Sequence, residues 1–226
     1  MARPARPVRT PRLLSRAAGR ARPGFTLIET AMALVIIGVG VVAMVDAQQA
    51  FMRSNTWSSQ AATATFLANE IREMTRQLDR HDPVTGLFLD GATLVGWGPE
   101  VGEVTVHDYD DLDDFDGVVF GVLGDFEGPI NAYGEVIPQL NADGTVMMNA
   151  GAVVPMLGWT QRVEVVKVSP FDTGPALTPD HTDPPSGDFE GRAVDEFPLL
   201  VTVIVEYQGP YDDQPTEVTR ISWIAP

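Results

Sequence analysis

The sequence lacks most of the residues and motifs that would point to an enzyme. Its 226 residues include no cysteine, which excludes a disulfide framework, a thiolate metal site and a cysteine nucleophile. There is no G-x-S-x-G elbow, H-E-x-x-H pair, P-loop or dinucleotide-binding fingerprint. The three histidines, His81, His107 and His181, each stand beside an acidic residue in segments expected to be loops. We expect them at the surface, and we predict that the protein is not an enzyme.

Basic residues are scarce outside the N-terminal head. Residues 1–24 hold seven arginines and no acid, whereas the rest of the chain holds eight of the 15 basic residues and all 31 acidic ones, a net charge of −23. An acidic body of this kind is repelled by nucleic acid and by anionic membrane surfaces, so we predict no nucleic-acid partner. It would stay soluble and could attract divalent cations. The head is rich in Pro and Ala, and we expect it to be disordered.

One hydrophobic run has the length of a membrane span. The 21 residues from Phe25 to Val45 are apolar apart from Glu29, two threonines and a few small residues, and about 20 helical residues cross a bilayer core. Arginines precede the run and acids follow it, which places the N-terminus in the cytoplasm and the body outside. The alternatives are a buried core helix, a secretory signal cleaved near Val45-Asp46-Ala47, and an uncleaved single-span anchor.

Glu29 is an ionisable residue inside this run, where a carboxylate costs at least a few kcal/mol. The run contains no lysine or arginine, so a cationic partner must come from elsewhere. A cut between Gly24 and Phe25 would create an α-amino group at Phe25, and the ammonium of another copy could then pair with Glu29. On this hypothesis Glu29 is unpaired in the monomer and neutralised in a polymer. The alternative is that Glu29 is protonated or extends to the headgroups.

The stretch from Gly24 to Glu29, GFTLIE, followed by an apolar helix, resembles the processing and methylation signal of type IV pilins and pseudopilins of bacteria. The resemblance covers about the first 50 residues. It implies that a membrane prepilin peptidase and methyltransferase cleaves after Gly24 and methylates the amine of Phe25. It also implies that Glu29 pairs with the N-terminus of a neighbouring pilin subunit. The leader of 24 residues is longer than many prepilin leaders.

The helix is expected to continue well beyond the membrane run. Residues 47–78 contain neither Gly nor Pro, and an apolar stripe at helical spacing is formed by Leu67, Ile71, Met74 and Leu78. Asp82-Pro83 is a stop signal. We predict one helix from about Thr26 to Arg80, with a transmembrane or filament-core half at 25–46 and an amphipathic half at 47–82.

Residues 83–226 are predicted to form an acidic β-sheet domain. Period-two alternation predicts strands at 101–106, 162–168, 201–207 and 217–223, with a hairpin connection over 207–217 and a long exposed loop at 169–198. A helix followed by an antiparallel sheet is an α+β layer pair, and the sheet would cover the apolar stripe of the helix. This layout agrees with the pilin resemblance.

An aspartate-rich run at 107–117 places six aspartates within nine residues, Asp108 to Asp116. Its core, DDLDDFDG, is similar to a segment of minor pilins of the MSHA (mannose-sensitive haemagglutinin) and PilV-like kind. We expect a solvated, turn-forming loop. Ca²⁺ binding is the alternative, with the candidate ligands Asp110, Asp111, Asp113, Asp114 and Asp116. The spacing does not fit an EF-hand, and residues 139–144 match that pattern only in part.

Two functional hypotheses follow. The first is a structural subunit, a minor pilin or pseudopilin, of a type IV pilus or type II secretion-like filament. It would be placed in the inner membrane and passed to the filament by an inner-membrane assembly machinery, and it would need no cofactor. The second is a membrane-anchored or secreted monomeric binding domain, which could depend on Ca²⁺.

Overall fold

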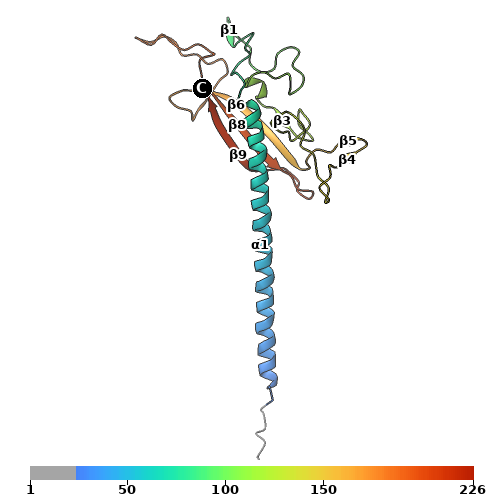
Figure 1. Cartoon of the computed structure of the whole chain (residues 1–226). Coiled ribbons are helices and arrows are strands. Elements are labelled where there is room, and N and C mark those ends of the chain that lie inside the picture. Colours follow the sequence, from blue (N-terminus) through green and yellow to red (C-terminus); the bar gives the residue numbers. More distant parts are fainter. Residues whose placement is uncertain (1–23) are drawn as a thin grey trace, which may run out of the picture. The chain divides into compact units, whose positions relative to one another are not determined.

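The computed structural model describes residues 24–226, so the predicted basic leader lies outside the described residues except for Gly24. The chain divides into two compact units, one ending at Met52 and the other spanning Arg53–Pro226. One helix, α1 (Leu27–Thr75), contributes to both, and Figure 1 shows it as a single unbroken ribbon. The predicted long helix is therefore confirmed.

The helix ends earlier than the predicted Arg80. Its last turn tightens, because the N–H of Arg76 donates to Glu73 O and the N–H of Leu78 donates to Thr75 O. The following residue, Asp79, leaves the helix to form a bridge with Asp111. This long-range backbone pairing, which local helix propensity cannot anticipate, ends the helix before the Asp82-Pro83 signal.

The second unit is built on an antiparallel sheet with strand order β3-β6-β8-β9. Its long strands are β6 (Trp159–Val168), β8 (Leu199–Tyr207) and β9 (Thr216–Ala225). The shorter elements are β3 (Val119–Phe120), β7 (Ala176–Leu177), which pairs with β6, the hairpins β1 (Phe88–Asp90)–β2 (Thr93–Val95) and β4 (Met148–Asn149)–β5 (Ala152–Val153), and the 3₁₀ turn η1 (Asp113–Phe115). The three predicted C-terminal strands and the hairpin connection are confirmed.

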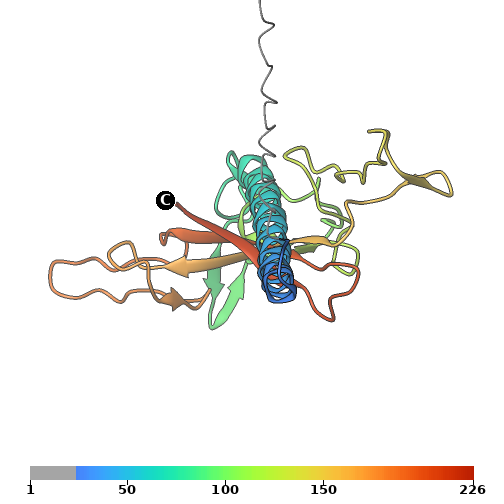
Figure 2. The ribbon, with the colours of Figure 1, turned by 90° about the horizontal axis from the view of Figure 1, so that it is seen from below.

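The apolar stripe of α1 packs on this sheet, as the α+β prediction requires. Figures 1 and 2 show the last turns of α1 against β6, β8 and β9. Leu67 and Ile71 are fully buried there. They belong to one core cluster with valines of β6 and β8, namely Val163, Val165, Val201, Val203 and Val205. Alternation along β6 places Val163 and Val165 on the helix-facing side, because successive side chains point to opposite faces of a sheet.

The strand predicted at 101–106 does not form. The segment makes local turns instead: the backbone N–H of Glu100 donates to the Glu103 carboxylate, and the N–H of Thr105 donates to the Asp108 carboxylate. Carboxylates that accept from nearby backbone N–H groups offer the backbone an alternative to a strand ladder, which explains why the alternation of valines did not suffice.

The segment 169–198 is less exposed than predicted. Besides the short strand β7, it contains two buried side chains, Val194 and Phe197. The buried Nζ of Lys167 on β6 donates to the backbone oxygens of Pro179 and Val194. A cation reaching from the sheet thus fixes both halves of the loop.

Candidate functional site

The N-terminal end of α1 is held by a reciprocal pair of hydrogen bonds. The backbone N–H and the hydroxyl of Thr26 both donate to Glu29 Oε2 at 3.0 Å, and the N–H of Glu29 donates to Thr26 Oγ1 at 3.3 Å. This is a capping box, in which the residue before the helix and the third helical residue satisfy each other's free N–H groups. The T-x-x-E spacing was readable in the sequence, and our sequence reasoning missed it.

The capping box corrects one premise of the assembly hypothesis. Glu29 is not without a partner in the single chain, because Thr26 donates two hydrogen bonds to its carboxylate. These donors are neutral, so the negative charge of Glu29 still has no cationic partner among the ion pairs of residues 24–226. The structure thus shows a local capping role for Glu29, and its pairing with the N-terminus of another copy stays a prediction.

The apolar part of α1 is exposed on every side. An 18-residue window of the helix has a mean hydropathy of 2.4, and none of that window is buried, so the helix is long and apolar enough to cross a membrane. Large side chains such as Leu27, Ile36 and Val42 are more than half exposed. In water, so large an apolar surface would be unfavourable. It therefore needs lipid or neighbouring protein around it.

The three histidines differ in their surroundings. His107 is exposed and His181 half-buried, as a surface prediction allows. His81 is buried, which overturns the prediction for that residue, and its Nδ1 lies 3.2 Å from Asp113 Oδ2. Burial and the neighbouring Arg80 lower the pKa of His81 to about 4.

The aspartate-rich run is folded into the domain, contrary to the predicted solvated loop. Asp111, Asp113 and Asp114 are between 0 and 1 % exposed. The apolar residues interleaved with them explain this burial, because Leu112 and Phe115 belong to the hydrophobic core and carry their neighbours inward. The sequence signal was the L-x-x-F spacing inside the acidic run.

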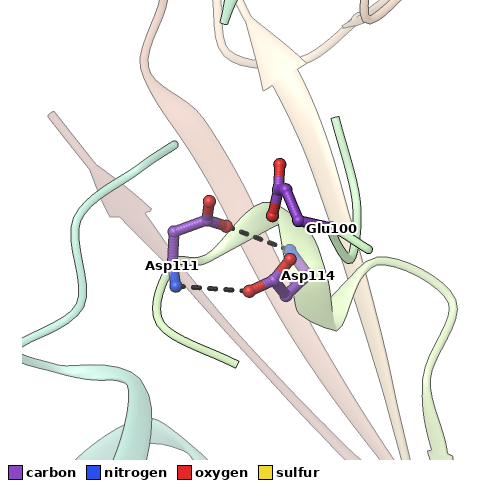
Figure 3. A group of neighbouring side chains, drawn as sticks. All are labelled: Glu100, Asp111 and Asp114. Carbon is purple, nitrogen blue, oxygen red and sulfur yellow. Dashed lines mark hydrogen bonds between the residues drawn. The ribbon is translucent and has the colours of Figure 1, made fainter. Parts of the chain in front are cut away.

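The five candidate ligands separate into different environments. Asp111 and Asp114 face Glu100, and one carboxylate oxygen of each residue lies within 4.8 Å of one from each of the other two (Figure 3). A second group of the same kind joins Asp114 to Glu103 and Asp110. Sequence reasoning missed both glutamates, because they precede the run and only folding brings them to it.

The other two candidates serve the fold. Asp113 pairs with His81. The Oδ1 atom of Asp116 accepts a hydrogen bond from the N–H of Val165 at 3.1 Å, and its Oδ2 accepts one from Trp97 Nε1 at 3.4 Å.

Burial and mutual repulsion make the cluster hard to ionise. Burial is the main cause for every member: it raises the pKa of Asp111 to about 9 and the pKa values of Asp114 and Glu100 to about 7. Repulsion between neighbouring carboxylates raises them further. Burial also raises the pKa of Asp113, to about 6. These directions describe negative charges that lack compensation.

The weaker acidic motif at 139–144 is a tight exposed turn. Oδ1 of Asp143 accepts hydrogen bonds from the N–H and the hydroxyl of Thr145 at 3.0 and 2.7 Å. Within the described residues, Asp143 belongs to no group of acids close enough to share an ion.

Comparison with known families supports the interpretation of the N-terminus. A family model described as the prokaryotic N-terminal methylation motif matches residues 19–45. No curated protein and no solved structure matches the chain. The chain therefore carries an N-terminal signal of the type IV pilin kind, which supports a pilin-like or pseudopilin subunit and points to a structural role.

Proposed function

We propose that this protein is a minor pilin or pseudopilin, a subunit of a type IV pilus or type II secretion-like filament. The observation that carries the proposal is the methylation motif at residues 19–45, continued by an apolar helix with exposed side chains on all sides. Processing at this signal would leave a methylated amine at the new N-terminus, and this amine could pair with an acid of a neighbouring subunit. An apolar helix that is exposed on all sides is stabilised when neighbouring helices cover it.

In this proposal each N-terminal residue has a distinct role. A prepilin peptidase cuts between Gly24 and Phe25, the amine of Phe25 is methylated, and the apolar half of α1 first anchors the chain in the inner membrane with its N-terminus in the cytoplasm. The helix then passes into the filament core beside other subunits. The carboxylate of Glu29 pairs with the ammonium of a neighbour, because an opposite charge is strongly favoured where water is absent.

The minor-subunit assignment rests on the aspartate-rich segment that resembles minor pilins. The burial of this segment in the second unit supports a structural role for the segment. The acidic second unit would face outward, where water and ions solvate its charges.

Two matched substitutions test the pairing role of Glu29. Glu29→Gln keeps an acceptor for Thr26 but removes the charge, whereas Thr26→Val removes the hydroxyl of the capping box and keeps the charge. We expect Glu29→Gln to lower incorporation into sheared filaments at least tenfold, and Thr26→Val to leave it within about twofold. Membrane insertion, measured by fractionation, should be unchanged in both.

The reverse result would contradict the proposed role. Normal incorporation of Glu29→Gln together with loss in Thr26→Val would make Glu29 a capping residue only. If the wild-type chain never enters filaments and stays a monomer, the alternative of an anchored or secreted binding domain would replace the filament proposal.

A further inference from the structure

We propose that Glu100, Asp111 and Asp114 form a Ca²⁺ site in the second unit. All three residues belong to the unit spanning Arg53–Pro226, so the proposal does not rest on the role of the N-terminal apolar helix. Asp114 also faces Glu103 and Asp110, which supply further negative charge next to the proposed ion.

The first argument is that backbone hydrogen bonds hold two of the carboxylates in place. Oδ1 of Asp111 accepts from the N–H groups of Asp113 and Asp114 at 2.9 and 3.1 Å. Oδ2 of Asp114 accepts from the N–H groups of Asp110 and Asp111 at 3.1 and 3.4 Å. Figure 3 shows this reciprocal arrangement, in which each aspartate keeps a second oxygen free. Metal ligands are commonly oriented in this way by hydrogen bonds from groups that do not themselves touch the ion.

The second argument comes from those remaining oxygens. Oδ2 of Asp111, Oδ1 of Asp114 and Oε2 of Glu100 are buried and have no hydrogen-bond partner. Asp111 and Asp114 are at most 1 % exposed, and Figure 3 shows the three carboxyl groups gathered around one place. A buried charge without a partner is strongly unfavourable, so a ligand of opposite charge would relieve a large cost.

No protein cation supplies that charge within residues 24–226. None of the ion pairs there includes Glu100, Asp111 or Asp114. The two buried basic side chains nearby are engaged elsewhere: His81 pairs with Asp113, and Lys167 donates to loop carbonyls.

The donor set selects the kind of ion. All the candidate donors are carboxylate oxygens, which suit hard cations, and neither group of candidate ligands among residues 24–226 includes a thiolate or an imidazole, which zinc prefers. Oxygens that lie 2.3–2.6 Å from one Ca²⁺ are at most about 5 Å apart, and the observed separations, within 4.8 Å, fit this limit. Ca²⁺ also accepts irregular geometry and water as additional ligands.

Binding would join two segments distant in sequence. Glu100 lies in the turn before the aspartate-rich run, and Asp111 and Asp114 flank the start of η1. The ion would thus fasten that turn to the core beside α1, since Leu112 and Phe115 of the same run already pack in the core.

Calorimetric titration of the full-length chain in detergent, after treatment with EDTA, tests the proposal. We expect CaCl₂ to bind at the cluster with a Kd on the order of 10⁻⁴ M or tighter, as in extracellular Ca²⁺ modules. Calcium at about 100 times this Kd should raise the Tm by roughly 5–10 °C. Asp114→Asn and Glu100→Gln should each weaken binding at least tenfold and abolish the shift in Tm.

The variants remain informative about folding. Asp114→Asn removes one of several neighbouring buried acids and keeps a side-chain oxygen that can accept from the N–H groups of Asp110 and Asp111. The metal-free Tm of this variant should therefore be at or above that of the metal-free wild type, so loss of binding is not loss of fold. Asp108→Asn is the matched control: it changes an exposed acid of the same run that is outside both groups, and it should bind Ca²⁺ like wild type.

Three outcomes would overturn the proposal. The first is the absence of calorimetric binding and of any shift in Tm with millimolar CaCl₂. The second is a shift that MgCl₂ reproduces equally, which would indicate screening of the acidic surface. The third is unchanged Ca²⁺ binding in Asp114→Asn and Glu100→Gln.

Discussion

At the residue scale, Glu29 and Asp114 are two acids whose roles are set by opposite surroundings. Glu29 is exposed at the start of an apolar helix and is held by its neighbour Thr26. Asp114 is fully buried, and one of its oxygens has no partner. Glu29 stands in the local motif GFTLIE at the start of an apolar run, so the sequence pointed to this residue, although its capping by Thr26 was missed. The site at Asp114 depends on Glu100, which comes close only after folding. The sequence therefore pointed to the aspartates of 110–116 as a group, and it did not separate the cluster from Asp113 and Asp116, which have structural contacts of their own.

Gly24 is the small residue directly before the proposed cut. Gly24→Glu should block processing, because a bulky charge would occupy the position where the signal has a small residue. Immunoblots of native-host cells should show only the longer, unprocessed form, and Gly38→Ala, within the helix, should be processed normally. Normal cleavage of Gly24→Glu would count against the proposed cut.

Gln161 is a buried polar residue that joins three parts of the second unit. Its Nε2 donates to Leu67 O at 2.8 Å and to Ile130 O at 3.1 Å, and its Oε1 accepts from the N–H of Ile130 at 2.8 Å. Gln161→Leu would leave these backbone groups without partners, so we expect a loss of about 1–3 kcal/mol in unfolding free energy. Thermal and urea unfolding would measure it. The exposed Gln208→Leu should change stability by less than about 0.5 kcal/mol, and equal effects would contradict the linking role of Gln161.

At the element scale, the strongly periodic segments were predictable and the segments between them were not. Strands β6, β8 and β9 follow from alternation, and α1 follows from its helical stripe and lack of Gly and Pro. In the segment 101–106, acidic side chains accept hydrogen bonds from the backbone and take the place of a strand ladder. At the end of α1, the backbone of Asp79 pairs with Asp111 instead of continuing the helix. The 169–198 loop is held to the sheet by hydrogen bonds from Lys167 to backbone oxygens within the loop. No pattern in the sequence predicts these contacts.

The Lys167 anchor predicts a pH dependence. Burial lowers the pKa of its ammonium to about 8, from 10.5, so between those values the folded state binds fewer protons than the unfolded state. The contribution of Lys167 to stability should therefore rise as pH rises from 8 to 10.5. Other groups such as Asp111 also titrate in this range, but they are present in both proteins, so their contributions to stability cancel when wild type is compared with Lys167→Met.

Urea unfolding at several pH values would measure this difference. The stability of wild type minus that of Lys167→Met should increase from pH 8 to 10.5, and Lys167→Met should show faster amide exchange in residues 178–194. A difference that stays flat or falls over this range would show that the ammonium is not shielded from water as the fold implies.

At the scale of the whole molecule, the two units require different solvents. The first exposes an apolar helix that needs lipid or protein around it, and the second encloses its own core and carries the acidic residues. The uneven distribution of charge and hydrophobicity along the sequence predicts this contrast, because the apolar run and the acids occupy separate stretches of the chain. The arrangement suits a chain that is anchored first and then assembled, with no filament partner needed for the second unit to pack its core.

The N-terminus of the protein recovered from its native host tests the central claim most directly. Intact mass and N-terminal sequencing of the filament or membrane fraction should show a chain that begins at Phe25 and carries a methyl group on its amine. A chain that still begins at Met1, or one that begins near Gln48 as after secretory cleavage, would contradict the filament account, because no ammonium at Phe25 would exist to pair with Glu29.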